Sequence, residues 1–95
     1  MAELADLALA PLITPEPANG LNRQALMALE PANQRRLLQR WLERNGLASL
    51  PARPLEALLQ RLALTRGPGR QHLASGRVLH WERQRLWLAE REQLP

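Results

Sequence analysis

Hydrophobic positions in the middle of the chain recur at the spacing of an α-helix. Between Pro31 and Gly46 the apolar side chains fall on one side, as a period of 3.6 residues requires. Proline suits the first turn of a helix, and glycine suits the position just past its end. The sequence therefore predicts a helix that begins at Pro31, ends before Gly46 and buries Leu37, Leu38, Trp41 and Leu42.

Two further helices are predicted on either side of this one. Asn22 can cap a short helix that turns Leu26 and Leu29 inward. Pro54 opens another helix, and the two glycines and the proline within residues 65–69 end it. The leucines of this last helix follow the i, i+3, i+4, i+7 pattern of a buried face, at Leu55, Leu58, Leu59 and Leu62.

The tail over residues 70–90 is compatible with a third long helix or with short strands. Its glutamate, arginine, glutamine and leucine content favours a helix. The strands would be residues 70–74, 77–82 and 85–89, joined by turns at Ser75-Gly76 and Arg83-Gln84. Their register gives one apolar face through the facing pairs Leu79–Leu88 and Trp81–Leu86. A helix would interrupt this apolar pattern, so strands are favoured, although the second turn lacks the glycine or asparagine of tight hairpins.

These elements predict an α+β fold in a single domain over residues 1–95. It is expected to be a small, mostly helical domain of about four helices, with a C-terminal antiparallel β-meander of two or three short strands. Residues 1–20 would hold an N-terminal helix and a proline-rich linker, residues 21–65 the helical core, and residues 70–90 the β-hairpin or meander.

Charge adds a preference for an anionic partner. The formal net charge is +4, and all thirteen basic residues are arginines. Codon bias explains the missing lysine, but the basic balance still favours a polyanion such as nucleic acid. A guanidinium group can grip a phosphate with two hydrogen bonds. The chain has no cysteine and no apolar run long enough to span a bilayer, so a cytoplasmic protein without membrane contact is expected.

Arginines recur every four residues on another side of the Pro31 helix, where a nucleic acid could bind. The predicted RNA-binding residues of this helix are Arg36, Arg40 and Arg44, with Arg35 beside them. A second basic cluster is predicted around the glycine-rich loop, at Arg66, Arg70 and Arg77. The alternative is an ordinary solvated helix face, in which Arg40 pairs with Glu43.

The three tryptophans are expected to differ in role. Trp41 and Trp81 face the core, whereas Trp87 points outward beside His80, where it can stack on an unpaired base or pack against another part of a larger protein. No catalytic residues are predicted, because the carboxylates are scattered and no serine has a neighbouring base. His72 and His80 lack metal-ligand spacing, so no metal or cofactor is expected in this chain.

The order of these elements resembles the helical substrate-binding domain that follows the catalytic domain of tRNA(Ile)-lysidine synthases. Residues 29–42, read as L-E-P-A-N-Q-R-R-L-L-Q-R-W-L, are similar to that family's L-P-x-x-x-Q-R-R-x-L-R-R-W/F-L helix. The likeness extends over roughly residues 21–89 and includes residues 21–26, 54–64, 67–70, 75–77 and the L-x-L strand at 86–88.

The resemblance implies a tRNA-binding fragment of a larger enzyme. The parent would be a ligase that uses ATP and Mg²⁺ to join lysine to the wobble cytidine of an isoleucine tRNA, and its catalytic domain would be a partner. The chain departs from the family in two ways: it has no serine-glycine-glycine phosphate loop, and Arg83-Gln84 stands where an aromatic residue and glycine often precede the last strand.

Two other functions remain open from the sequence. A small basic helical module could dock an acidic protein partner through the same arginines. A helix-turn-helix DNA binder could use the Pro31 and Pro54 helices. The loop between these helices, residues 47–53 with Pro51, is longer than the turn of that motif and argues against it.

Overall fold

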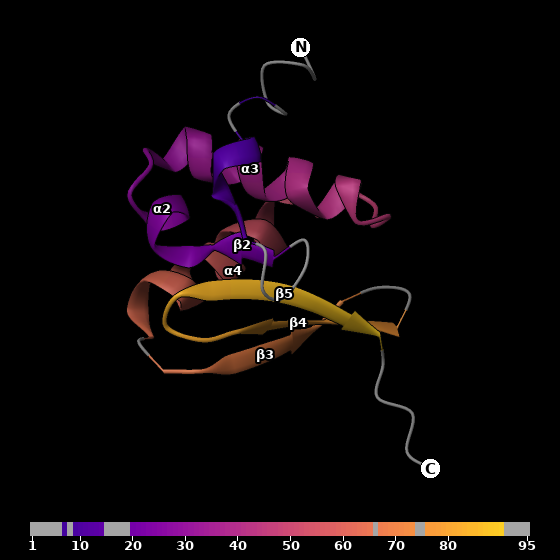
Figure 1. Ribbon diagram of the computed structural model, residues 1–95. Helices are drawn as coiled ribbons and strands as arrows, with labels where there is room; N and C mark the ends of the chain where they lie inside the picture. The colour runs from indigo at the N-terminus through magenta and orange to yellow at the C-terminus, as the bar shows by residue number, and fades with distance from the viewer. Residues whose placement is uncertain (1–6, 8, 15–19, 66, 74–75, 91–95) are drawn as a thin grey trace.

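The structure is a computed structural model that describes residues 7, 9–14, 20–65, 67–73 and 76–90. Figure 1 shows the labelled α-helices grouped on one side of a sheet. In chain order the elements are η1 (Ala10–Leu12), β1 (Ile13–Thr14), β2 (Gly20–Asn22), α2 (Arg23–Met27), α3 (Pro31–Arg44), α4 (Ala52–Leu64), β3 (Gly69–His72), β4 (Arg77–Trp81) and β5 (Arg85–Glu90).

The sheet has five strands in the order β1-β2-β5-β4-β3, and every neighbouring pair is antiparallel. The prediction of about four helices with a meander of two or three strands is therefore wrong, although the α+β class is right. The missed strands, β1 and β2, lie in or next to the segment assigned to a proline-rich linker. At two and three residues they are too short to show an alternating pattern, and they exist because β2 pairs with the distant β5.

The strands of the tail are confirmed, and so is their register. Leu79 lies opposite Leu88, and Trp81 lies opposite Leu86, as the apolar pattern requires. The predicted N-terminal helix over residues 2–10 falls mostly outside the described residues.

One apolar core joins the inner face of the sheet to the three helices. The side chains of Trp41 in α3 and Trp81 in β4 are 0% and 1% exposed, which confirms both as core residues. Around them pack leucines from every helix and from the central strands, among them Leu21, Leu26, Leu38, Leu58, Leu79 and Leu86. The helices thus cover one face of the sheet and leave the other without a helix among the described elements.

The ends of the helices mostly follow the sequence signals. The Asn22 Oδ1 accepts a hydrogen bond from the Ala25 N–H at 3.0 Å, which caps α2 as predicted. Helix α3 begins at Pro31 and is followed by Gly46 at φ 85°, a conformation that favours glycine. Helix α4 begins at Ala52 rather than at Pro54, because a proline in the first turn loses no intrahelical hydrogen bond.

A buried arginine ties the sheet to the helices. The side chain of Arg23, at the start of α2, is 4% exposed. Its guanidinium donates to the carbonyl oxygens of Leu62 and Glu82, both at 2.8 Å, and to that of Thr65. Burial lowers the pKa of the Arg23 guanidinium, because desolvation disfavours its charged form. One side chain therefore connects α2, the end of α4 and the turn between β4 and β5.

The same arginine explains a turn whose sequence is unusual for a hairpin. Arg83-Gln84 joins β4 to β5, and the Glu82 N–H closes the turn on the Arg85 carbonyl at 3.0 Å. The Arg23 N–H donates to the Gln84 carbonyl at 2.9 Å, in addition to the side-chain bond to Glu82. These tertiary hydrogen bonds hold a turn that lacks the glycine or asparagine favoured locally.

Replacing Arg23 with methionine should destabilise the domain by roughly 3 kcal/mol. The substitution leaves three carbonyl groups without charged donors, a loss that relief of the buried charge only partly offsets. Urea unfolding followed by circular dichroism measures the change. Arg83→Met is the matched control, because Arg83 is exposed and makes no hydrogen bond or ion pair within the described residues. Equal stability of the two variants would refute the role of Arg23.

Gly69→Ala should also destabilise the domain, by about 1–3 kcal/mol. Gly69 lies opposite Trp81, and an added Cβ would come within 2.6 Å of two carbons of that buried indole. Gly67→Ala is the control, because its added Cβ would meet nothing within 4 Å. The difference is measured by comparing the urea midpoints of unfolding of the two variants, provided that the dependence of the unfolding free energy on urea is unchanged. Equal midpoints would contradict the close contact between Gly69 and Trp81.

Candidate nucleic-acid interface

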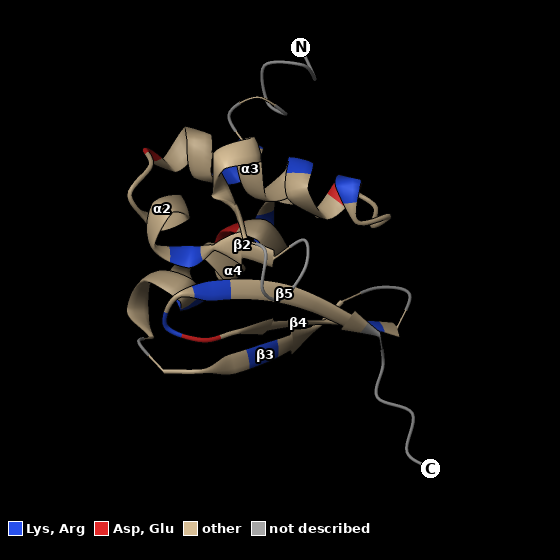
Figure 2. Ribbon diagram, in the orientation of Figure 1, with Lys and Arg blue, Asp and Glu red and all other residues tan. Residues whose placement is uncertain are grey.

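Helix α3 presents the predicted RNA-binding arginines because its apolar side is committed to the core. The side chains of Leu37, Leu38, Trp41 and Leu42 are all buried, so the remaining arc of the helix faces outward. Figure 2 shows basic residues at intervals along this helix. The predicted arrangement of an anchored face and a row of arginines is therefore present.

Two arginines of α3 have guanidinium groups open to solvent. Arg36 is exposed, and its Nη2 donates to the Asn33 Oδ1 at 3.0 Å, a neutral partner within the same helix. Arg44 is exposed in the last turn and makes no hydrogen bond or ion pair within the described part of the chain. No carboxylate of the described residues is paired with Arg36 or Arg44, so both can meet an external anion.

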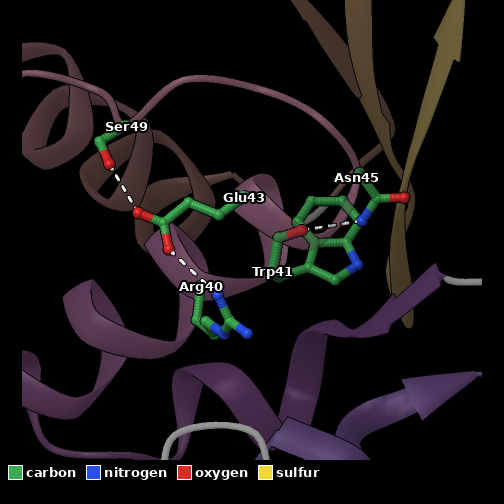
Figure 3. A network of polar contacts seen from close by, with 5 residues as sticks. All are labelled: Arg40, Trp41, Glu43, Asn45 and Ser49. Carbon is green, nitrogen blue, oxygen red and sulfur yellow. Dashed lines mark hydrogen bonds and ion pairs between the residues drawn. The ribbon is translucent and has the colours of Figure 1, made fainter. Parts of the chain in front are cut away.

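The other two arginines of this helix take part in ion pairs. The Arg35 Nη1 lies 2.8 Å from the Glu56 Oε1 of α4, with side chains 43% and 46% exposed. The Arg40 Nη1 lies 3.5 Å from the Glu43 Oε1, which is the pairing that the sequence left as an alternative. Figure 3 shows that Glu43 also accepts a hydrogen bond from Ser49, at 2.7 Å. Exposed pairs of this kind contribute at most about 1 kcal/mol, so an approaching phosphate can compete for the arginines.

The second predicted cluster is not brought together within the described residues. Arg66 lies outside them. Arg70 is exposed on β3 and pairs in register with His80, on the face of the sheet away from the helices. Arg77 shares the opposite face with Leu79 and Trp81. Its Nη1 donates to the Asn45 carbonyl at 3.2 Å, and its Nε is buried and has no hydrogen-bond partner among the residues that the structure describes. Arg77 therefore braces the end of α3.

Trp87 lies on the face of the sheet that carries no described helix. Its ring stacks on that of His80, with centroids 5.6 Å apart and planes inclined by 11°. The predicted proximity of these two side chains is confirmed. Trp87 is half-buried, unlike the two core tryptophans, so part of its indole stays accessible.

A groove of about 740 Å³ was not predicted from the sequence. It lies between α2, α3, α4 and the β4–β5 turn, and its lining includes the apolar side chains of Met27 and Leu59. Three arginines also line it: Arg23, Arg35 and Arg83. No sequence signal marks it, because its walls come from four separate segments and Arg23 is buried by tertiary contacts alone.

Among the described residues, no three histidine, aspartate or glutamate side chains are grouped so that they could hold a metal ion. None of the described helices is long and apolar enough to cross a membrane.

Comparison with known proteins gives a consistent family. The family model of the TilS substrate binding domain matches residues 21–87. A tRNA(Ile)-lysidine synthase of Parasynechococcus marenigrum is 44% identical over 80 residues, which are 84% of this chain and 23% of that protein. A tRNA(Ile)-lysidine synthase of Prochlorococcus marinus is 31% identical over 81 residues, which are 85% of this chain and 23% of that protein. The chain thus spans less than a quarter of these relatives. No solved structure matches it.

Proposed function

The chain belongs to the TilS substrate binding domain family, and we propose that it holds tRNA for a tRNA(Ile)-lysidine synthase without contributing catalytic groups. The parent enzyme would join lysine to the wobble cytidine of an isoleucine tRNA. The catalytic domain of that ligase would be the protein partner, and the setting would be the cytoplasm.

The observation that carries this proposal is the outward face of α3. Arg36, in the second turn of α3, and Arg44, in its last turn, are exposed on a helix whose other side is fixed by Trp41 and leucines. Guanidinium groups spaced along a rigid helix suit the spaced phosphates of a folded RNA. Such contacts orient the RNA and carry little sequence information, so the choice of one tRNA would rest mainly with the rest of the enzyme.

The two ion-paired arginines of α3 can add to the same RNA-binding surface. Arg35 and Arg40 each form an ion pair with a partly exposed carboxylate. Both lie on the same helix as Arg36 and Arg44. A phosphate that approaches Arg36 or Arg44 can exchange with these carboxylates at small cost, because exposed pairs are weak. The resulting contacts would depend strongly on salt, since each phosphate contact releases a counterion.

ATP and Mg²⁺ would bind elsewhere in the parent enzyme. The family's phosphate loop has no counterpart among these 95 residues, and the glycines at Gly67 and Gly69 lead into β3 rather than into a helix. The residues of this chain would therefore position the substrate and leave the chemistry of activation to another domain.

Neutralising Arg36 and Arg44 together, as Arg36→Gln/Arg44→Gln, should weaken tRNA binding about tenfold at physiological salt. It should also reduce the slope of log affinity against log salt by about 1.5, as expected for two lost phosphate contacts. Fluorescence anisotropy of labelled tRNA over a salt titration measures both quantities.

The matched control is Arg53→Gln/Arg83→Gln, which removes the same charge from exposed arginines outside α3 that are unpaired within the described residues. Equal losses in the two double variants would mean that net charge, and not the α3 face, governs binding. Absence of tRNA binding by the unmodified chain would instead favour a module that docks an acidic protein.

A further inference from the structure

A row of three side chains crosses the face of the sheet that has no described helix. The strand register places Arg70 of β3 next to His80 of β4, and His80 next to Trp87 of β5. The row therefore presents a guanidinium, an imidazole and an indole on three adjacent strands. The sequence predicted that His80 and Trp87 lie together, and the structure adds Arg70 from the third strand.

The stack with His80 holds the indole in a defined orientation. The two rings are nearly parallel, with planes inclined by 11° and centroids 5.6 Å apart. One face of Trp87 is thus directed toward His80, and the other is directed toward β2. Leu21 and Asn22 of β2 pair with Leu86 and Arg85 of β5, respectively. Continuing that register by one residue places Gly20 level with Trp87, so β2 contributes no side chain on the far side of the indole.

The charge around the row favours a polyanion. Arg70 is exposed and makes no hydrogen bond or ion pair within the described residues, and His72 is exposed on the same strand. Glu82 carries a negative charge near the start of β5, but its Oε1 lies 2.7 Å from the Arg85 Nε, which neutralises it locally. The positive charge of Arg70 therefore lies beside an accessible aromatic ring, a combination that suits the phosphate and the base of one nucleotide.

We propose that this face binds an unpaired nucleotide of the RNA, with the base stacked on Trp87 and the adjoining phosphate held by Arg70. His80 acts as a positioning residue that fixes the indole. Aromatic rings interleaved with arginines bind single-stranded nucleic acid because every base offers a stacking face. The inference rests on the proposed tRNA-binding function and adds a second surface, distinct from α3, that distinguishes unpaired from paired RNA.

Binding measurements on the 95-residue chain test the proposal. Trp87→Ala should weaken tRNA binding about tenfold, the size expected for loss of one base–aromatic stack. The salt slope should stay unchanged, because no phosphate contact is removed. Trp87→Phe should restore most of the affinity, since it retains an aromatic face. Leu64→Ala removes an apolar side chain that is 82% exposed, and it serves as a control that should bind as the unmodified chain does.

Intrinsic fluorescence gives a readout that a purely structural role would not change. Trp41 and Trp81 are 0% and 1% exposed, so only Trp87 can touch an external base. A short single-stranded oligouridylate should quench the emission of the unmodified chain but not that of Trp87→Phe. A blunt RNA duplex should not quench it, because its bases are already stacked. Because Trp87→Phe preserves the ring, this comparison holds even where Trp87→Ala unfolds.

The outcomes separate this proposal from the function on which it rests. Unchanged tRNA affinity in Trp87→Ala, together with no quenching, overturns the stacking platform and leaves the α3 interface standing. In that case the face is a packing surface for another part of the parent chain. Equal quenching by single-stranded and duplex RNA also overturns it. Failure of the unmodified chain to bind tRNA overturns both proposals.

Discussion

The arrangement of this domain depends on one buried cation. The Arg23 guanidinium satisfies carbonyl groups at the end of α4 and in the β4–β5 turn, while its own backbone belongs to α2. A buried charge is costly unless it is fully hydrogen-bonded, so these partners must stay in place for the charge to be tolerated. This requirement fixes the position of the sheet relative to the helices. It thereby also fixes the directions of two outer surfaces, which are the outward side of α3 and the face of the sheet without a described helix.

Those surfaces have different chemistry although both carry arginine. On α3 the guanidinium groups stand along a helix, either open to solvent or in weak exposed ion pairs, which suits contact with a phosphate backbone. On the sheet a single arginine accompanies a stacked imidazole and indole, which suits contact with a base. The core lies between the two surfaces, so an RNA bound to both would have to pass around an edge of the domain.

Local patterns explain what the sequence could and could not predict. Helix α3, the Asn22 cap and the pairing of Leu79 with Leu88 were predictable, because each follows from the spacing of neighbouring residues. The strands β1 and β2 were missed because they are stabilised by pairing with residues far along the chain. The same reason hides Arg23 and the groove beside it. The spacing also predicted that the arginines of α3 lie apart from its buried side. It could not predict which of them form ion pairs, because a partner such as Glu56 belongs to another helix.

The two edge strands of the sheet, β1 and β3, also affect whether copies of the domain can associate through strand pairing. Strand β1 has only two residues, and β3 has four, of which Arg70 and His72 are exposed. Pro68, immediately before β3, has no N–H to offer to an incoming chain. Edge strands that are short, charged or flanked by proline pair poorly with strands of other chains. Such pairing between edge strands is a common route to aggregation. The edges of this open sheet are therefore poorly suited to pairing with a second copy of the chain.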